Sequence, residues 1–173
     1  ALYMQKEYKL SVTTEEILEG VNQVVKDFYF KEARMKPGVY ELIRMLKKNQ
    51  VSLIIATATD ADMAKTALMR NGIWKDFAGM ITCEEAGTGK TSPKVFELAR
   101  ERLQTKKEET WIFEDSLYAV KTAFEAGFPV CSIYDAYSKD NTEEIRTFSD
   151  IYVKDFYEIE SCQVFQRKKQ QLY

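Results

Sequence analysis

Apolar residues along the chain follow two spacings, one typical of amphipathic helices and one typical of short buried strands. The strand-like runs are continuous apolar stretches, as in strands covered on both faces, and they lie at 51–56, 79–83, 110–113, 130–134 and 151–153. Helical spacing predicts helices over 13–33, 37–49, 60–71, 93–103, 117–126 and 142–148, with further helix at 1–10 and in the tail. Because strands and helices alternate from residue 51 onward, the pattern predicts an α/β fold, a doubly wound parallel sheet with right-handed crossovers.

Capping and breaking residues mark the ends of several of these helices. Thr13 and Glu16 have the spacing of a capping box, so a helix is expected to begin there. The segment Lys36–Gly38 breaks that helix, and Pro37 is expected to begin the next one. Gly72 supplies a C-terminal stop for the helix that precedes it. These signals predict boundaries that the apolar spacing alone leaves open.

Amino-acid composition and net charge argue against nucleic acid and membranes as partners. The 45% hydrophobic and 13% aromatic content over 173 residues indicates a packed domain. With 25 basic and 27 acidic residues the net charge is -2, which offers no basic surface for nucleic acid or an anionic membrane. No apolar run has the length of a membrane span, and no signal-peptide pattern is present. We therefore expect neither nucleic acid nor a membrane as a partner.

Cysteine and histidine usage bound the chemistry further. The three cysteines are widely spaced in mostly apolar settings, which favours buried thiols and a cytoplasmic location. The chain contains no histidine, so Ser-His-Asp and Cys-His catalysis are excluded. Any chemistry must depend on carboxylates, lysines, hydroxyls and a hard cation.

Polar residues follow three of the predicted strands or lie in the adjoining loops. Glu114 and Asp115 end the apolar run that begins at Trp111, Thr57 ends another run, and Lys90 lies in a loop. The carboxyl ends of parallel strands share one edge of a sheet, where α/β folds bind ligands. A hydroxyl at a helix N-terminus and a lysine suit a phosphate, and paired acids suit Mg²⁺. Together they predict a phosphoryl-transfer site.

Four stretches in this order resemble the motifs of the haloacid dehalogenase-like (HAD) hydrolases, in the helical-cap branch that includes β-phosphoglucomutase and phosphoglycolate-phosphatase-like enzymes. They are Lys36–Leu42, Val51–Thr59, Gly89–Phe96 and Trp111–Gly127. The resemblance runs from about residue 13 to 158. Two positions depart from the family pattern, since Thr91 stands where a proline is usual and Ala119 where a glycine is usual.

The resemblance implies a role for each candidate site residue. Thr57 and Lys90 would be catalytic, and together with Ala58 they would bind the phosphoryl group, while Asp115 with Glu114 would hold Mg²⁺. The implied activity is that of a Mg²⁺-dependent phosphatase acting on a small phosphorylated metabolite through an aspartyl-phosphate, with a sugar-phosphate mutase as the alternative. The implied architecture is a Rossmann-type core over 36–173 preceded by the C-terminal part of a helical cap over 1–35.

One motif of the family is absent from the chain. The apolar strand followed by D-x-D-x-T, which carries the nucleophilic aspartate, has no counterpart; Asp60 and Asp62 form the only D-x-D, and Asp60 is read as a helix N-cap. In the family fold the absent strand is central, so a gap of about 10 Å is expected between the strands ending at Thr57 and Phe113. We expect an N-terminal segment of the same protein to be a partner, and the chain without it to fold poorly and to show no turnover.

Other classes remain as alternatives. Glu84–Thr91 is close to a P-loop, which would indicate a nucleotide hydrolase, but Glu84 stands where the first glycine belongs. A receiver domain also combines acids, a hydroxyl and a lysine, yet its acidic pair comes first in the chain and here it comes last. A non-catalytic HAD-like module is the third alternative, because the nucleophile is absent.

Overall fold

Short parallel strands form two separate sheets in the computed structural model, which describes residues 1–165. One sheet pairs β1 with β2, placing Ile55 opposite Met80, and the other has the order β3-β4-β5, with Cys131 opposite Ile151. The strands are β1 (Ile55–Thr57), β2 (Met80–Thr82), β3 (Ile112–Glu114), β4 (Val130–Ile133) and β5 (Ile151–Val153). Since every pairing is parallel and helices connect the strands, the predicted α/β class is confirmed.

The helices predicted between residues 1 and 148 all form, within a few residues of their expected ends. The α-helices are α1 (Leu2–Glu7), α2 (Thr14–Lys31), α3 (Val39–Lys48), α4 (Ala61–Arg70), α5 (Cys83–Ala86), α6 (Lys94–Leu103), α7 (Leu117–Glu125) and α8 (Thr142–Thr147). The 3₁₀ turns are η1 (Trp74–Asp76), η2 (Lys107–Glu109), η3 (Ala136–Asn141), η4 (Phe156–Ser161) and η5 (Gln163–Phe165). The helix predicted for the tail is thus 3₁₀ up to residue 165, and its remainder lies outside the described residues.

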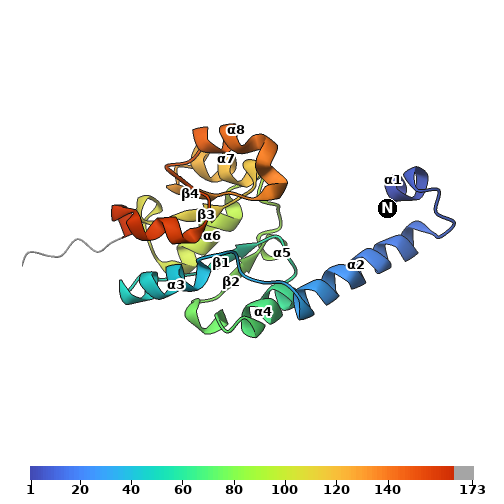
Figure 1. The fold of residues 1–173 in the computed structure, drawn as a ribbon, viewed down its shortest axis with the longest axis horizontal. Coiled ribbons are helices and arrows are strands. Elements are labelled where there is room, and N and C mark those ends of the chain that lie inside the picture. Colours follow the sequence, from blue (N-terminus) through green and yellow to red (C-terminus); the bar gives the residue numbers. More distant parts are fainter. Residues whose placement is uncertain (166–173) are drawn as a thin grey trace, which may run out of the picture.

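The N-terminal helices form an arm that projects from the α/β body (Figure 1). Thr13 Oγ1 accepts from the Glu16 amide at 3.2 Å and Glu16 Oε2 accepts from the Thr13 amide at 2.8 Å, so the predicted capping box is confirmed. At the other end of the arm, the Asn71 side chain donates to the Ala33 carbonyl at 3.0 Å. Contacts between α2 and α4 join the arm to the body.

Two segments differ from the sequence prediction. Residues 51–54 are not strand, because the ladder with β2 begins only at Ile55; before it, the Val51 amide donates to the Leu46 carbonyl at 2.9 Å and the Leu53 carbonyl accepts from the Ala78 amide at 2.7 Å. The loop expected over 84–92 begins inside α5, since Thr82 Oγ1 accepts from the Glu85 amide at 3.0 Å and caps the helix. Gly87, with φ of 68°, then ends α5.

An apolar slot separates the two sheets. Among the described residues β1 and β3 belong to different sheets, and a cavity of about 520 Å³ lies between them. Its walls include Ile55 and Ala56 of β1 and Trp111 and Phe113 at β3, with α3 and α6 closing the sides. The facing edges of β1 and β3 therefore present backbone groups to a common apolar space.

The turn before α3 is held against the C-terminal part of the body. Gly38 has φ of 83°, and a Cβ at this position would lie 2.5 Å from the Tyr157 amide nitrogen and 2.7 Å from the Phe156 carbonyl carbon. The Phe156 amide donates to the Pro37 carbonyl at 3.1 Å. This close approach requires glycine and fixes the backbone beside Lys36.

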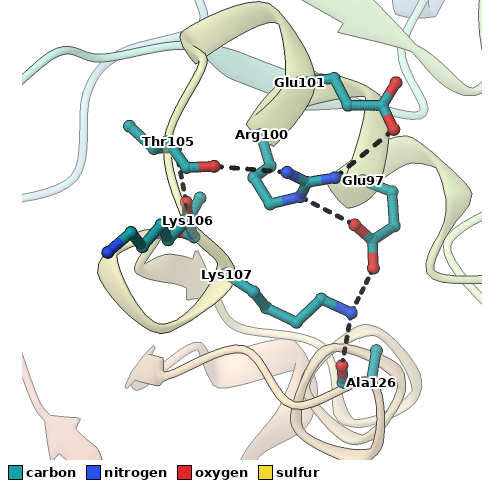
Figure 2. A network of polar contacts seen from close by, with 8 residues as sticks. Glu97, Arg100, Glu101, Thr105, Lys106, Lys107 and Ala126 are labelled. Carbon is teal, nitrogen blue, oxygen red and sulfur yellow. Dashed lines mark hydrogen bonds and ion pairs between the residues drawn. The ribbon is translucent and has the colours of Figure 1, made fainter.

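A polar network anchors the connection from α6 to β3 (Figure 2). Arg100 donates to Glu97 Oε2 at 3.0 Å and to the Thr105 carbonyl at 3.3 Å. Lys107 pairs with Glu97 and also donates to the Ala126 carbonyl at 3.0 Å, which reaches the end of α7. Because these bonds join α6, the connection to β3 and the end of α7, they fix where β3 enters the sheet.

The sequence predicted buried cysteine thiols and no membrane-spanning segment, and the structure describes both features. All three cysteines are free; Cys131 is fully buried, and burial together with nearby Cys162 raises its pKa to about 12, while Cys83 and Cys162 are half-buried. In residues 1–165, none of the helices combines the length and the apolar character needed to cross a bilayer.

Candidate active site

Charged side chains gather where β3 and β4 end. Lys36, Lys90, Glu114 and Asp115 line one cavity of about 360 Å³. Asp135, two residues beyond β4, joins them through Lys36. Parallel pairing of β3 and β4 brings their carboxyl ends to the same edge, which is why residues far apart in sequence meet here.

Lys90 and Glu114 form a buried ion pair. Lys90 Nζ contacts Glu114 Oε1, and the two side chains are 14% and 6% exposed. The other oxygen of Glu114, Oε2, accepts from the Asp115 amide at 3.1 Å and from Ser116 Oγ at 3.2 Å. Both carboxylate oxygens therefore have partners, as a buried charge requires. The predicted role of Glu114 as a metal ligand stays a prediction, while its contacts hold Lys90 in place.

Lys36 bridges two carboxylates at the mouth of the cavity. Its Nζ lies 3.1 Å from Asp115 Oδ2 and also contacts Asp135 Oδ2. Burial lowers the pKa of Lys36, but hydrogen bonds to Asp135 and Asp115 outweigh it, so the pKa lies above its ordinary value. The hydrogen bond from Lys36, with one from the Tyr137 amide, lowers the pKa of Asp135. These shifts keep both Lys36 and Asp135 charged at neutral pH.

Thr57 ends β1, whose Ile55 and Ala56 line the slot across from Trp111 and Phe113. Its Oγ1 accepts from the Thr59 amide at 3.0 Å, which leaves its hydroxyl hydrogen for another acceptor. Asp60 Oδ1 accepts from the amides of Asp62 and Met63 at 3.0 Å, so the prediction that Asp60 caps α4 is confirmed.

The structure brings together some of the predicted residues and not others. Lys90, Glu114 and Asp115 share a cavity, whereas Thr57 and Ala58 are not among the described residues that line it. Sequence reasoning missed Lys36 and Asp135. An acid directly after a strand was the signal used for Glu114 and Asp115, and the same signal was available for Asp135, which follows the run 130–134.

A divalent cation fits this edge only in part. Among residues 1–165, no three His, Cys, Asp or Glu side chains are grouped so as to hold a metal. Mg²⁺, however, is commonly held by one or two carboxylates together with waters and substrate phosphate. Asp115 satisfies that minimal requirement, since its side chain is 36% exposed and lines the cavity.

The loop that resembled a P-loop does not form a phosphate cradle of that type. Glu84 lies inside α5, and Gly87 ends that helix in a left-handed conformation. Lys90 points to Glu114 rather than standing free at the N-terminus of α6. These positions do not favour a nucleotide hydrolase.

Comparison with known proteins agrees with the sequence motifs. The profile of haloacid dehalogenase-like hydrolases matches residues 1–133. A phosphorylated-carbohydrates phosphatase of Thermotoga maritima is 30% identical over 113 residues, which cover 65% of this chain and 52% of that protein. The chain thus spans about half the length of this curated relative.

Solved structures show the same fold. The β-phosphoglucomutase of Clostridium difficile matches with a TM-score of 0.71 at 16% identity, over 94% of this chain and 72% of that one. CbbY from Rhodobacter sphaeroides in complex with phosphate gives 0.70 at 23% identity, over 87% and 67%. The fold, the motif order and the profile match over most of the chain lead to one conclusion: the chain belongs to the haloacid dehalogenase-like hydrolase family.

Proposed function

We propose that this chain forms part of a Mg²⁺-dependent phosphatase acting on small phosphorylated metabolites. The observation that supports it best is the arrangement at the end of β3, where the Lys90–Glu114 pair lies beside Asp115 at the mouth of one cavity. Neutralising the charge of a phosphoryl group requires positive charge, which a fixed lysine supplies directly and an accessible carboxylate at the same sheet edge supplies through the cation that it holds. The T. maritima relative is named a phosphatase of phosphorylated carbohydrates, which agrees with this class of substrate.

The slot between β1 and β3 is the proposed seat of the nucleophile. The space of about 520 Å³ is apolar, and both facing strands run parallel to their partners. We propose that an N-terminal segment of the same protein lies there as an added central strand, hydrogen-bonded to both edges. A D-x-D at its end would emerge between Thr57 and Asp115, at the carboxyl edge of the completed sheet.

The proposal gives a separate role to each of three site residues: Thr57, Lys90 and Asp115. Thr57, whose oxygen already accepts from the Thr59 amide, donates its hydroxyl hydrogen to the phosphoryl group. Lys90, held by Glu114, neutralises the phosphate and the attacking aspartate of the added segment. The aspartate attacks phosphorus and the ester P–O bond breaks, so that an aspartyl-phosphate forms and the alcohol leaves with a proton from the second aspartate of the D-x-D. Water activated by that second aspartate then hydrolyses the aspartyl-phosphate to the free aspartate and inorganic phosphate. Asp115 would hold Mg²⁺, which would supply further positive charge to the site.

Strand complementation tests the proposal. The chain is assayed with Mg²⁺ and an aryl phosphate, alone and with a synthetic peptide that carries an apolar strand followed by D-x-D-x-T. Trp111 lines the slot, so its fluorescence reports whether the peptide binds. We expect no turnover by the chain alone and Mg²⁺-dependent turnover with the peptide.

Two controls separate the steps. A peptide with Asn in place of the first Asp is expected to bind without restoring turnover, and Asp115→Asn is expected to bind the active peptide without Mg²⁺-dependent turnover. If the peptide that keeps both aspartates changes Trp111 fluorescence but restores no activity, the catalytic assignment is refuted. Turnover by the chain alone would refute the need for the added strand, and transfer of phosphate to a sugar rather than to water would favour a mutase.

A further inference from the structure

Lys36 occupies the space in front of Asp115. Its ammonium lies 3.1 Å from Asp115 Oδ2, and both side chains are about one-third exposed, at 34% and 36%. The backbone at Lys36 has little freedom, because the next residues are fixed by the Phe156–Pro37 hydrogen bond and by the close approach of Gly38 to Tyr157. The fold therefore holds the positive charge of Lys36 next to the Asp115 carboxylate, on the side that faces the cavity.

A divalent cation on Asp115 and the ammonium of Lys36 exclude one another. Mg²⁺ takes oxygen ligands at about 2.0–2.1 Å. A cation at that distance from the Asp115 carboxylate would stand within a few ångströms of the Lys36 ammonium, and the two like charges repel strongly at partly buried sites. Lys36 must therefore leave Asp115 Oδ2 before a cation takes that oxygen.

Asp135 provides a second carboxylate partner for the Lys36 ammonium. Asp135 Oδ2 already contacts the Lys36 ammonium, and Asp135 Oδ1 accepts from the Tyr137 amide at 2.8 Å, which holds the carboxylate in place. A lysine that moves off Asp115 thus keeps one charged partner and is not left unpaired. The Lys36–Asp135 contact joins two segments 99 residues apart, so it is a tertiary feature.

We propose that Lys36 is an internal competitor of the cation at Asp115, and that Asp135 is the positioning residue that draws Lys36 away. The inference rests on the proposed function, in which Asp115 is the Mg²⁺ ligand. It assigns the two residues opposite effects on cation affinity: Lys36 weakens binding and Asp135 strengthens it through Lys36.

Calorimetric titration with MgCl₂ of the chain carrying the bound D-x-D-x-T peptide, with no substrate present, tests this assignment. Lys36→Met is expected to tighten binding about ten-fold, the factor for removing one partly exposed like charge beside a dication. Lys36→Arg, which keeps the charge, is expected to bind as the wild type does. Asp135→Asn is expected to weaken binding about three- to ten-fold, because Lys36 then has only Asp115 as its partner.

The double variant decides how Asp135 acts. In the Lys36→Met background, Asp135→Asn is expected to change the Mg²⁺ affinity by less than two-fold, since the residue that Asp135 positions is gone. A full loss in that background would show that Asp135 contacts the cation itself, and would overturn the positioning role. Arg34→Met serves as the matched control, because Arg34 lines the same cavity but forms no ion pair with Asp115 in the described structure.

The proposed function and this inference fail in different ways. One outcome refutes the competitor role alone. In it the wild type binds Mg²⁺, Asp115→Asn abolishes that binding, and Lys36→Met leaves the affinity unchanged or weaker. The cation assignment of Asp115 then stands. If neither the wild type nor Lys36→Met binds Mg²⁺, the cation assignment is refuted and the inference with it. Circular dichroism melts of each variant separate a loss of binding from a loss of fold.

Discussion

Replacing Gly38 by alanine tests whether the turn before α3 depends on a backbone contact. Gly38 has φ of 83°, so alanine there adopts a left-handed conformation that costs about 1–2 kcal/mol. Its Cβ would lie 2.5 Å from the Tyr157 amide nitrogen and 2.7 Å from the Phe156 carbonyl carbon, and these are backbone atoms that cannot rotate away. Relief of that overlap requires η4 to move, at about 1–3 kcal/mol.

The same movement breaks the hydrogen bond from the Phe156 amide to the Pro37 carbonyl, which is 3.1 Å long. A bond of this kind contributes about 0.5–1.5 kcal/mol. Taking the strain, the overlap and the lost bond together, Gly38→Ala is expected to lower the free energy of unfolding by about 2.5–6.5 kcal/mol.

Gly72 provides a matched control. It also has a positive φ, of 75°, but a Cβ there meets nothing within 4 Å. Gly72→Ala is therefore expected to cost only the conformational term, about 1–2 kcal/mol. Urea unfolding followed by tryptophan fluorescence compares the two variants with the wild type. If Gly38→Ala and Gly72→Ala lose the same stability, within about 0.5 kcal/mol, the contact between this turn and η4 does not constrain the fold.

Three polar contacts give further measurable consequences. Lys90→Met is expected to lower the free energy of unfolding by about 3–5 kcal/mol in urea titrations, because it leaves the Glu114 carboxylate, 6% exposed, without its counter-charge; a loss below about 1 kcal/mol would contradict this. The hydrogen bond from Lys36 lowers the pKa of Asp135 below 3.8. The stability that the ionised Asp135 contributes is therefore complete above pH 3.8 and is lost as pH falls through the lower pKa of the folded protein. The difference in melting temperature between wild type and Asp135→Asn is expected to shrink below pH 3.8 and should not shrink between pH 7 and 5. Thr13→Ala removes the capping box, so amides in the first turn of α2 are expected to exchange about three- to ten-fold faster with an unchanged melting temperature, and unchanged exchange would show that the cap is not formed in solution.

Local sequence signals predicted the helices well, for an evident reason. The capping box at Thr13, the N-cap Asp60 and the helix opened after Pro93 depend on contacts within a few residues, and the structure confirms each of them. The strand of 51–56 was predicted too long, because strand length depends on a partner. Only residues 55–57 have a strand partner in β2, while the other edge faces the slot.

The candidate site divides in the same way. The strand-end position of Glu114 and Asp115 was visible in sequence, since three apolar residues precede the two acids. The sequence also predicted Lys90 as a site residue, but its ion pair with Glu114 spans 24 positions and required the structure. The pairing of Lys36 with Asp135, 99 positions away, left no local signal.

Sequence alone determined the fold class, the family motifs and the absence of a histidine base, because these depend on residue type, periodicity and order along the chain. Tertiary structure decided which charges meet. Parallel pairing of β3 with β4 brings Asp115 and Asp135 to one edge, and the turn at Gly38 places Lys36 between them. Contacts between distant segments depend on how the strands pair and where η4 packs, and no local pattern of residues encodes that geometry.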